Sequence, residues 1–210
     1  MTERPRRLPE MEEAGWTHFR LRSQFQAGVV ACLENFLDCP HATFVHRHWF
    51  RAPTAEVVRC QVRRNDDGAE AAYFNEPRKA SAVWWLLAPR QGGMRHVDRF
   101  VAPHTSEVSY DFPSGLSYRI TSVCTPVEED QTLVHTTVSF RPRWPWLGAG
   151  VRLFFKPLSQ WIIRQDMRML ALQSRRRRPS GQTLLSTSAD LLGPHIVAWR
   201  QALLAGMGPP

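Results

Sequence analysis

Apolar side chains near the N-terminus recur at the spacing of one face of a helix. From about residue 24 they repeat every three or four positions, which is the period of an amphipathic helix. This apolar face consists of Phe25, Val29, Val30, Leu33 and Leu37. The spacing therefore predicts a helix that begins at about residue 24 and runs into the stretch from Glu34 to Phe50.

Alternating and β-branched runs in the middle of the chain predict strands. Ala55–Arg64 alternates and is followed by the turn signal Asn-Asp-Asp-Gly, after which we expect a polar, irregular segment to about residue 79. Between Met94 and Pro142, short runs rich in Val, Ile and Thr are separated by breaks containing Pro, Gly and Asp. This part of the sequence predicts an antiparallel meander.

Helical spacing returns in the last third of the chain. After the Pro-rich break at residues 141–150, it predicts one helix from about Val151 to Arg175 and a last helix within residues 188–206. Ser188 or Asp190 is expected near the N-terminal cap of that last helix. The order of helix, strands and helices predicts an α+β fold, whose curved antiparallel sheet wraps around the long late helix and leaves a cavity.

Composition is that of one folded domain with a full hydrophobic core. The chain has 210 residues, of which 43% are hydrophobic and 22% charged, and this excludes a disordered protein. We expect residues 1–14 to be a polar lead-in and residues 15–210 to form a single domain. The apolar run Ala82–Ala88 is far shorter than the roughly 20 residues that cross a bilayer, and we expect no membrane span.

The cysteines suggest a cellular compartment, and the distribution of the net charge disfavours nucleic acid as a partner. The four cysteines form no Cys-x-x-Cys pair and the N-terminus has no apolar signal segment, so we expect a cytoplasmic protein with free thiols. The net charge of +8 is concentrated partly in residues 175–178. That run is more typical of a solvated helix end than of a nucleic-acid site, because no aromatic residues interleave with it.

An acidic residue interrupts the apolar stripe of the predicted late helix. Asp166 lies one turn from Ile162 and Ile163 on one side and from Met169 and Leu170 on the other. A carboxylate buried there needs a cation, a hydrogen-bond network or a metal. Taken alone, a salt bridge to an arginine that faces the core is the simplest interpretation.

Metal-capable side chains also lie within the apolar segment that follows the first predicted helix. Asp38, His41 and His46 have the spacing D-x2-H-x4-H, and apolar residues separate them. Two imidazoles with a distant carboxylate, here Asp166, are the ligands of a facial triad that holds Fe(II) and leaves positions open for O2 and substrate. We expect Asp38 to accept a hydrogen bond from His41, and His48 to lie outside the ligand set.

The same residues carry a family resemblance. Asn35, Asp38, His41 and His46 fit N-x2-D-x2-H-x4-H, which resembles the iron-binding segment of Rieske non-haem iron oxygenases. The likeness is to the branch of vanillate demethylase, dicamba monooxygenase and pheophorbide a oxygenase. Asp166 matches the acidic iron ligand on a late helix of that branch, and the likeness extends over most of residues 16–206.

The resemblance implies a fold, an activity and a role for each of these residues. The fold would be a helix-grip (START-like) domain, and His41, His46 and Asp166 would bind one Fe(II). Asp38 would carry the incoming electron, with Asn35 beside it. The activity would be O2-dependent hydroxylation, demethylation or ring oxidation of a hydrophobic or aromatic substrate.

The electron-supplying half of such an oxygenase is expected on another chain. Members of the family hold a Rieske 2Fe–2S cluster with a Cys-x-His and a Cys-x-x-His pair, whereas this sequence has only Cys39-Pro40-His41. We expect a separate Rieske or ferredoxin-type partner, and a trimer-like oligomer in which electrons cross between subunits. Alternatively, the chain is a truncated gene product, or a domain that has lost its redox chemistry and kept its pocket.

A binding protein without catalytic activity is the main alternative. Helix-grip domains hold apolar small molecules, and this chain has eight Trp and eleven Phe with which to line a pocket. Candidate pocket residues are Phe44, Trp49, Trp84 and Trp85, although each fits an aromatic core as well. A zinc hydrolase is disfavoured because the sequence contains no His-Glu-x-x-His motif.

Overall fold

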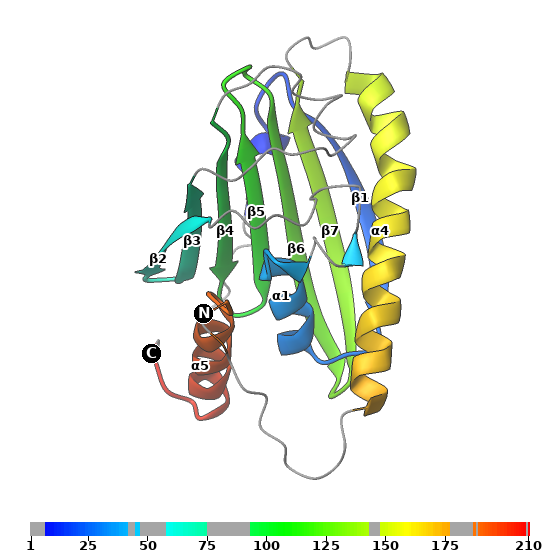
Figure 1. Cartoon of the computed structure of the whole chain (residues 1–210). Helices are drawn as coiled ribbons and strands as arrows, with labels where there is room; N and C mark the ends of the chain where they lie inside the picture. Colours follow the sequence, from blue (N-terminus) through cyan, green and yellow to red (C-terminus); the bar gives the residue numbers. More distant parts are fainter. Residues whose placement is uncertain are drawn as a thin grey trace.

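The described elements form an antiparallel sheet with helices on its concave side and along one edge (Figure 1). The structure is a computed structural model, which describes residues 7–41, 45–46, 58–74, 93–142, 148–176, 187, 189–208 and 210. The strands are β1 (Thr17–Phe25), β2 (Arg59–Asn65), β3 (Gly68–Phe74), β4 (Arg95–Val101), β5 (Thr105–Asp111), β6 (Ser117–Glu128) and β7 (Gln131–Arg141). The helices are η1 (Pro9–Met11), α1 (Val29–Leu37), α4 (Gly148–Arg176) and α5 (Gly193–Leu204). The predicted α+β class is confirmed.

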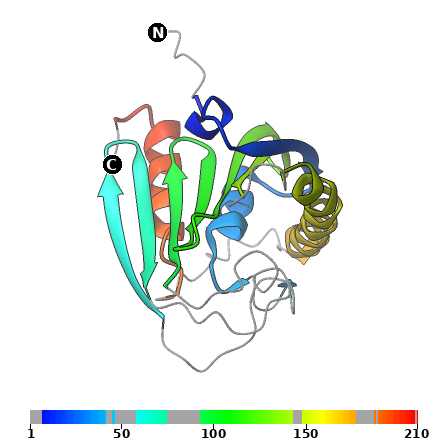
Figure 2. The ribbon, with the colours of Figure 1, turned by 90° about the horizontal axis from the view of Figure 1, so that it is seen from above.

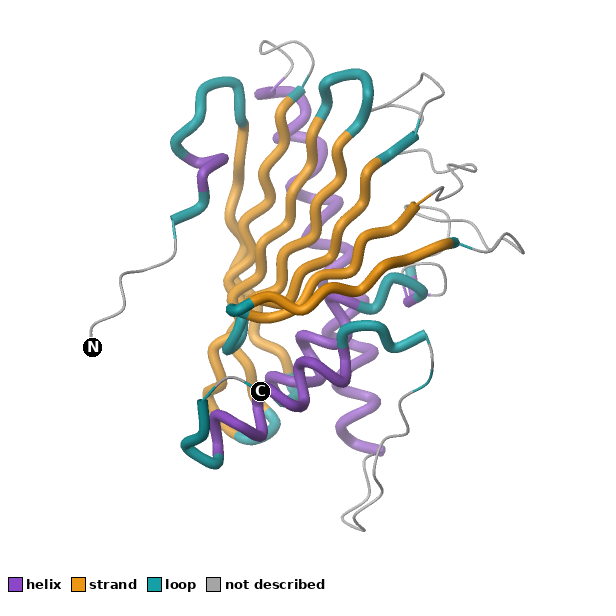
Figure 3. Tube along the Cα trace, turned by 90° about the vertical axis from the view of Figure 1, so that its left-hand side faces the viewer, coloured by secondary structure: helices purple, strands orange, loops and turns teal. Residues whose placement is uncertain are grey.

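Strands β2 to β7 form a meander, and β1 pairs with β7 at one edge of the sheet. Its strand order is β1-β7-β6-β5-β4-β3-β2, and every neighbouring pair is antiparallel. The strands fan out with the twist that L-amino acids impose (Figure 3). The meander predicted between Met94 and Pro142 is confirmed as β4 to β7.

The first strand was not predicted, and the first helix begins later than expected. Thr17–Phe25 buries Phe19, Leu21 and Phe25 on one face of β1 and exposes the arginines between them. This period of two is the pattern of a strand that is half covered. Phe25 is thus the last residue of β1, and the prediction of a helix from residue 24 was wrong by five residues, since α1 starts at Val29.

The segment after the first turn was also misassigned. The predicted strand is confirmed over Arg59–Asn65, whereas residues 55–57 lie outside the described residues. Gly68–Phe74, expected to be irregular, is β3. The expectation failed because Gly and Ala have a weak preference for strands. Gly68 adopts a positive φ of 152°, and a Cβ there would collide with the Phe100 carbonyl oxygen.

The helices are arranged around the concave side of the sheet. Viewed from above, α4 runs along the β1 edge and α1 lies within the curve of the sheet (Figure 2). Both late helices are confirmed, and Asp190 lies near the N-terminal end of α5, as predicted. The N-cap is the apolar Leu192, and the Asp190 carboxylate instead accepts a hydrogen bond from the Thr187 backbone N–H. Ser188, the other candidate cap, lies outside the described residues.

Two groups of buried side chains stabilise this arrangement. One joins α1, α5 and the strands near β3, and the other joins α4 to β1, β6 and β7. Burial of each large apolar side chain contributes roughly 1.5–3 kcal/mol. Among the described residues, no helix combines the length and the hydropathy of a transmembrane segment.

Candidate metal centre

Three residues that are distant in the sequence meet beside α4. Asp166 points from the middle of α4 toward His41 and His46, which follow α1 in the chain. The Nε2 atom of His46 lies 3.1 Å from Oδ1 of Asp166, and Nε2 of His41 lies 3.7 Å from the same oxygen. The two imidazole rings have centroids 5.2 Å apart and an interplanar angle of 79°. Each of the three residues offers one ligand atom, and these atoms all lie within 4.8 Å of one another.

These separations fit a shared cation. Two nitrogen or oxygen ligands about 2.1 Å from a metal and at right angles to each other lie about 3 Å apart. Within the described part of the chain, Nε2 of His41 and Oδ1 of Asp166 are buried without a hydrogen bond. Buried polar atoms are almost always paired, so these two atoms indicate that a ligand belongs between them. A divalent iron fits this set of two imidazoles and one carboxylate.

The other nitrogen of each ring is bound by the protein. Nδ1 of His41 lies 2.6 Å from the carbonyl oxygen of Asp38, and Nδ1 of His46 lies 2.9 Å from Oε1 of Gln165. Each Nδ1–H therefore donates to an oxygen, and this fixes the tautomer in which Nε2 carries the lone pair. Both rings are thus oriented with Nε2 toward Asp166.

One predicted contact is confirmed in more detail, and one residue of the site was not predicted. The expected hydrogen bond from His41 to Asp38 is present, and its acceptor is the main-chain carbonyl of Asp38, which also accepts from the His41 backbone N–H. Gln165 was missed altogether. The signal for it was its place directly before Asp166 in α4, from which it reaches the second histidine.

Electrostatics favour an ionised Asp166. Burial opposes ionisation, but His41 and then His46 outweigh it, so the pKa of Asp166 is held below its ordinary value of 3.8. Burial likewise opposes a charge on His41, yet Asp166 and the Asp38 carbonyl raise the pKa of His41 above 6.5. Among the described residues, the structure thus places histidines against the buried carboxylate, where the sequence alone had suggested an arginine.

A cavity of about 140 Å³ opens beside the three residues, between the sheet, α1 and α4. Its walls are largely apolar, with a few hydroxyl groups from the strands. The apolar lining includes Val108, Ile120, Val138, Ile162 and Ile163. The predicted cavity is confirmed, but the candidate pocket residues Phe44, Trp49, Trp84 and Trp85, as well as His48, lie outside the described residues.

Asp38 lies between this cavity and a second hollow. Asp38 and His41 line both the cavity and a groove of about 380 Å³ on the other side, which Asn35 also lines. Burial raises the pKa of Asp38, and the adjacent His41 offsets part of that effect. The Asn35 amide is 6% exposed and, among the described residues, neither its oxygen nor its nitrogen is hydrogen-bonded.

A protein-family model matches most of the chain. The model of the vanillate O-demethylase oxygenase C-terminal domain matches residues 25–206. The chain belongs to this family. The match includes the whole candidate centre, from Asn35 to Asp166, and begins at the last residue of β1. No curated protein sequence is significantly similar to the chain.

Solved structures share the fold of this family member. Dicamba monooxygenase bound to dicamba superimposes with a TM-score of 0.78 at 14% identity, covering 95% of this chain and 63% of the other. NdmA of Pseudomonas putida CBB5 gives 0.68 at 15% identity, covering 96% of this chain and 53% of that one. The complex of NdmA with caffeine gives 0.67 at 16% identity, covering 96% and 55%. The chain thus spans about half to two thirds of these structures.

Proposed function

We propose that this chain is the catalytic component of a Rieske-type non-haem iron oxygenase. In this proposal, His41, His46 and Asp166 bind one mononuclear Fe(II). The bound iron would supply the O2 chemistry for hydroxylation, demethylation or ring oxidation. Membership of an oxygenase C-terminal domain family supports this activity.

One observation carries the proposal. Nε2 of His41 and Nε2 of His46 lie 3.7 and 3.1 Å from Oδ1 of Asp166, and the Nδ1 atom of each ring is held by a hydrogen bond. Three oriented ligands on one side of a cavity leave the opposite side available for substrate and O2. A binder of apolar molecules would not require a buried carboxylate to face two imidazoles.

The cavity supports a small aromatic substrate. A volume of about 140 Å³ is comparable to the cavity of about 150 Å³ that holds benzene in an engineered protein. The apolar walls would exclude water and place a ring beside the iron ligands. Dicamba and caffeine, which are bound in two structures of similar fold, are small ring compounds as well.

Asp38 and Asn35 are proposed to serve the transfer of an electron to the site. Asp38 lines the groove as well as the cavity, so it connects the outer surface to His41. A Rieske or ferredoxin-type partner that docks at the groove would bring its 2Fe–2S cluster near Asp38. This arrangement fits a trimer-like assembly in which the donor belongs to another subunit.

The four cysteines form no disulfide, which supports a cytoplasmic location.

The binding of iron tests this function first. Purified protein is loaded anaerobically with Fe(II), and the iron bound per chain is counted for wild type, Asp166→Ala and the control Asp130→Ala, which changes an exposed turn residue. We expect about one iron per chain in wild type and control and a marked loss in Asp166→Ala. Equal iron in all three proteins, or none in wild type, would refute the proposed centre.

The alternative function makes the opposite prediction for ligand binding. If the chain were a non-catalytic binder of an apolar molecule, affinity for an aromatic probe would be unchanged in the double variant His41→Ala, Asp166→Ala. We expect instead that Fe(II) alters the binding of the probe in wild type and not in the double variant, which equilibrium titration measures.

A further inference from the structure

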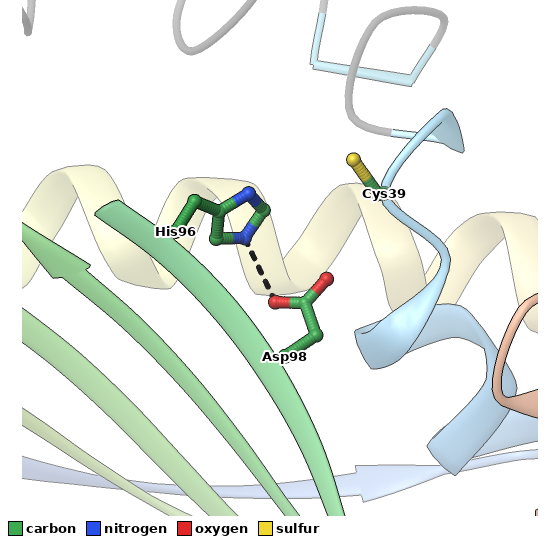
Figure 4. Close-up of side chains that lie close together, drawn as sticks. All are labelled: Cys39, His96 and Asp98. Carbon is green, nitrogen blue, oxygen red and sulfur yellow. Dashed lines mark hydrogen bonds and ion pairs between the residues drawn. The ribbon is translucent and has the colours of Figure 1, made fainter. Parts of the chain in front are cut away.

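A second group of metal-capable side chains lines the same cavity. Cys39, His96 and Asp98 each offer a ligand atom, and these atoms all lie within 4.8 Å of one another. Figure 4 shows the Cys39 sulfur opposite the edge of the His96 ring, with Asp98 below. Nε2 of His96 lies 2.8 Å from Oδ1 of Asp98. None of the three residues belongs to the candidate iron centre.

The strand that carries two of these residues has an inverted pattern. His96 and Asp98 are separated by one residue in β4, so both point to the same face of the sheet. They are 1% and 2% exposed, whereas the apolar Val97 between them is only partly buried on the other face. A buried carboxylate is unfavourable by several kcal/mol unless it is compensated, and here the His96 imidazole lies within hydrogen-bonding distance of it. The strand thus places two metal-capable side chains on the face that lines the cavity.

The surroundings hold the three ligand atoms in place. The His96 ring is stacked between Tyr73 and Tyr110, with centroid distances of 4.5 and 4.3 Å and interplanar angles of 16° and 14°. This stacking fixes the plane of the imidazole, so its Nε2 edge is directed at Asp98. The Tyr73 hydroxyl interacts with both Cys39 and Asp98. Preorganised ligands of this kind lower the entropy lost on metal binding.

We propose that Cys39, His96 and Asp98 form a second metal site, for a divalent cation of borderline softness such as Zn²⁺. Sulfur, imidazole nitrogen and carboxylate oxygen are the three ligand types that Zn²⁺ takes in proteins. The sulfur ligand distinguishes this site from the candidate iron centre, whose ligands are nitrogen and oxygen alone. Because all three residues line the cavity, a fourth position faces it, and a water or an anionic oxygen of a bound molecule would fill that position.

The site would join two elements that together shape the cavity. Cys39 lies in the turn after α1, between Asp38 and His41, while His96 and Asp98 belong to β4. A metal bound by all three residues would connect this turn to the sheet. The second site does not depend on iron at the candidate centre. An experiment can therefore refute either proposed site without refuting the other.

Cobalt(II) provides a probe that distinguishes the two sites. Metal-free protein is titrated anaerobically with Co²⁺, and the near-ultraviolet thiolate-to-cobalt charge-transfer band is recorded. We expect this band in wild type and in the control Cys60→Ser, because Cys60 is an exposed thiol on β2. The band should be lost in Cys39→Ser and weakened in Asp98→Asn. It should persist in His41→Ala and Asp166→Ala, which change only the other ligand set.

Two outcomes of the cobalt titration would overturn the second site. One is the absence of the charge-transfer band in wild type. The other is loss of the band in Asp166→Ala as well as in Cys39→Ser, which would mean that Cys39 joins the iron ligands. A readout on wild type guards against a misfolded variant: Zn²⁺ should protect Cys39 from alkylation while Cys60 still reacts, as peptide mass spectrometry measures. Equal alkylation of Cys39 with and without Zn²⁺ would also refute the site.

Discussion

Single hydrogen bonds orient the two histidines of the candidate iron centre. Gln165 accepts from Nδ1 of His46 at 2.9 Å, and the Asp38 carbonyl accepts from Nδ1 of His41 at 2.6 Å. Partners of this kind fix the ring and raise the basicity of the nitrogen that binds the metal. They therefore affect the affinity for the metal without binding it themselves.

The Gln165 contact gives a prediction about affinity. Replacing Gln165 by Leu should lower Fe(II) affinity by about 10–100-fold, because His46 loses the acceptor that fixes its tautomer. The matched control is Gln160→Leu, an exposed position in the same helix, which should leave affinity unchanged. Anaerobic competition with a chelator measures both. Equal affinity in the two variants would contradict the orienting role of Gln165.

A second prediction at this scale concerns pH. His41 has a pKa raised above 6.5, so protons compete with iron already above that pH, and affinity should fall about tenfold per pH unit below the pKa of His41. In the metal-free protein, the stability of the fold depends on pH in the opposite direction to the iron affinity. The His41 interaction stabilises the fold below pH 6.5 and is lost as pH rises through the raised pKa. Asp166, with its lowered pKa, stabilises above pH 3.8 and loses this effect as pH falls.

Iron titrations and urea unfolding over a pH series check these signs. The His41→Ala variant is the reference, since it removes the competition between protons and iron at His41 and also the contribution of His41 to stability. An iron affinity that stayed constant from alkaline to acidic pH would contradict the proton competition at His41.

At the scale of elements, α4 holds the acidic ligand because its other buried residues fix its rotation. Leu170 lies one turn after Asp166 and is 2% exposed. Its packing keeps the Asp166 face of α4 toward the cavity. The sequence predicted this helix and its stripe because the spacing extends over many residues. It failed for β1, where the alternation in Thr17–Phe25 merges at Phe25 with the start of a helical pattern.

The packing of α4 gives a prediction about stability. Leu170→Ala should lower the free energy of unfolding by about 2–5 kcal/mol, since it leaves a cavity in the core. Leu172→Ala, at an exposed position of the same helix, should change it by less than about 0.5 kcal/mol. Urea denaturation of the metal-free proteins measures both. Similar small losses at both positions would show that α4 does not pack as described.

For the whole molecule, the fold class and the candidate ligands were accessible from sequence, and the finer contacts were not. The spacing of Asn35, Asp38, His41 and His46 is local and specific, so it could be seen along the chain. The pairing of β1 with β7, and the approach of Cys39 to β4, depend on how distant segments fold together. A His-x-Asp pair within a strand was the only local signal of the second cluster.

The partner of the whole molecule is also open to a direct test. The chain spans about half to two thirds of dicamba monooxygenase and NdmA structures, and the proposed electron donor lies on another subunit. We expect no substrate turnover by the iron-loaded chain with O2 alone, and turnover once a Rieske or ferredoxin-type donor and its reductase are supplied. Co-purification from the native host that yields no iron–sulfur protein would count against this arrangement.

The most direct test of the iron centre is anomalous diffraction at the iron edge from crystals of the anaerobically Fe(II)-loaded protein. We expect one strong peak between Nε2 of His41, Nε2 of His46 and the Asp166 carboxylate. A peak only between Cys39, His96 and Asp98, or no peak despite bound iron in solution, would contradict the proposed centre.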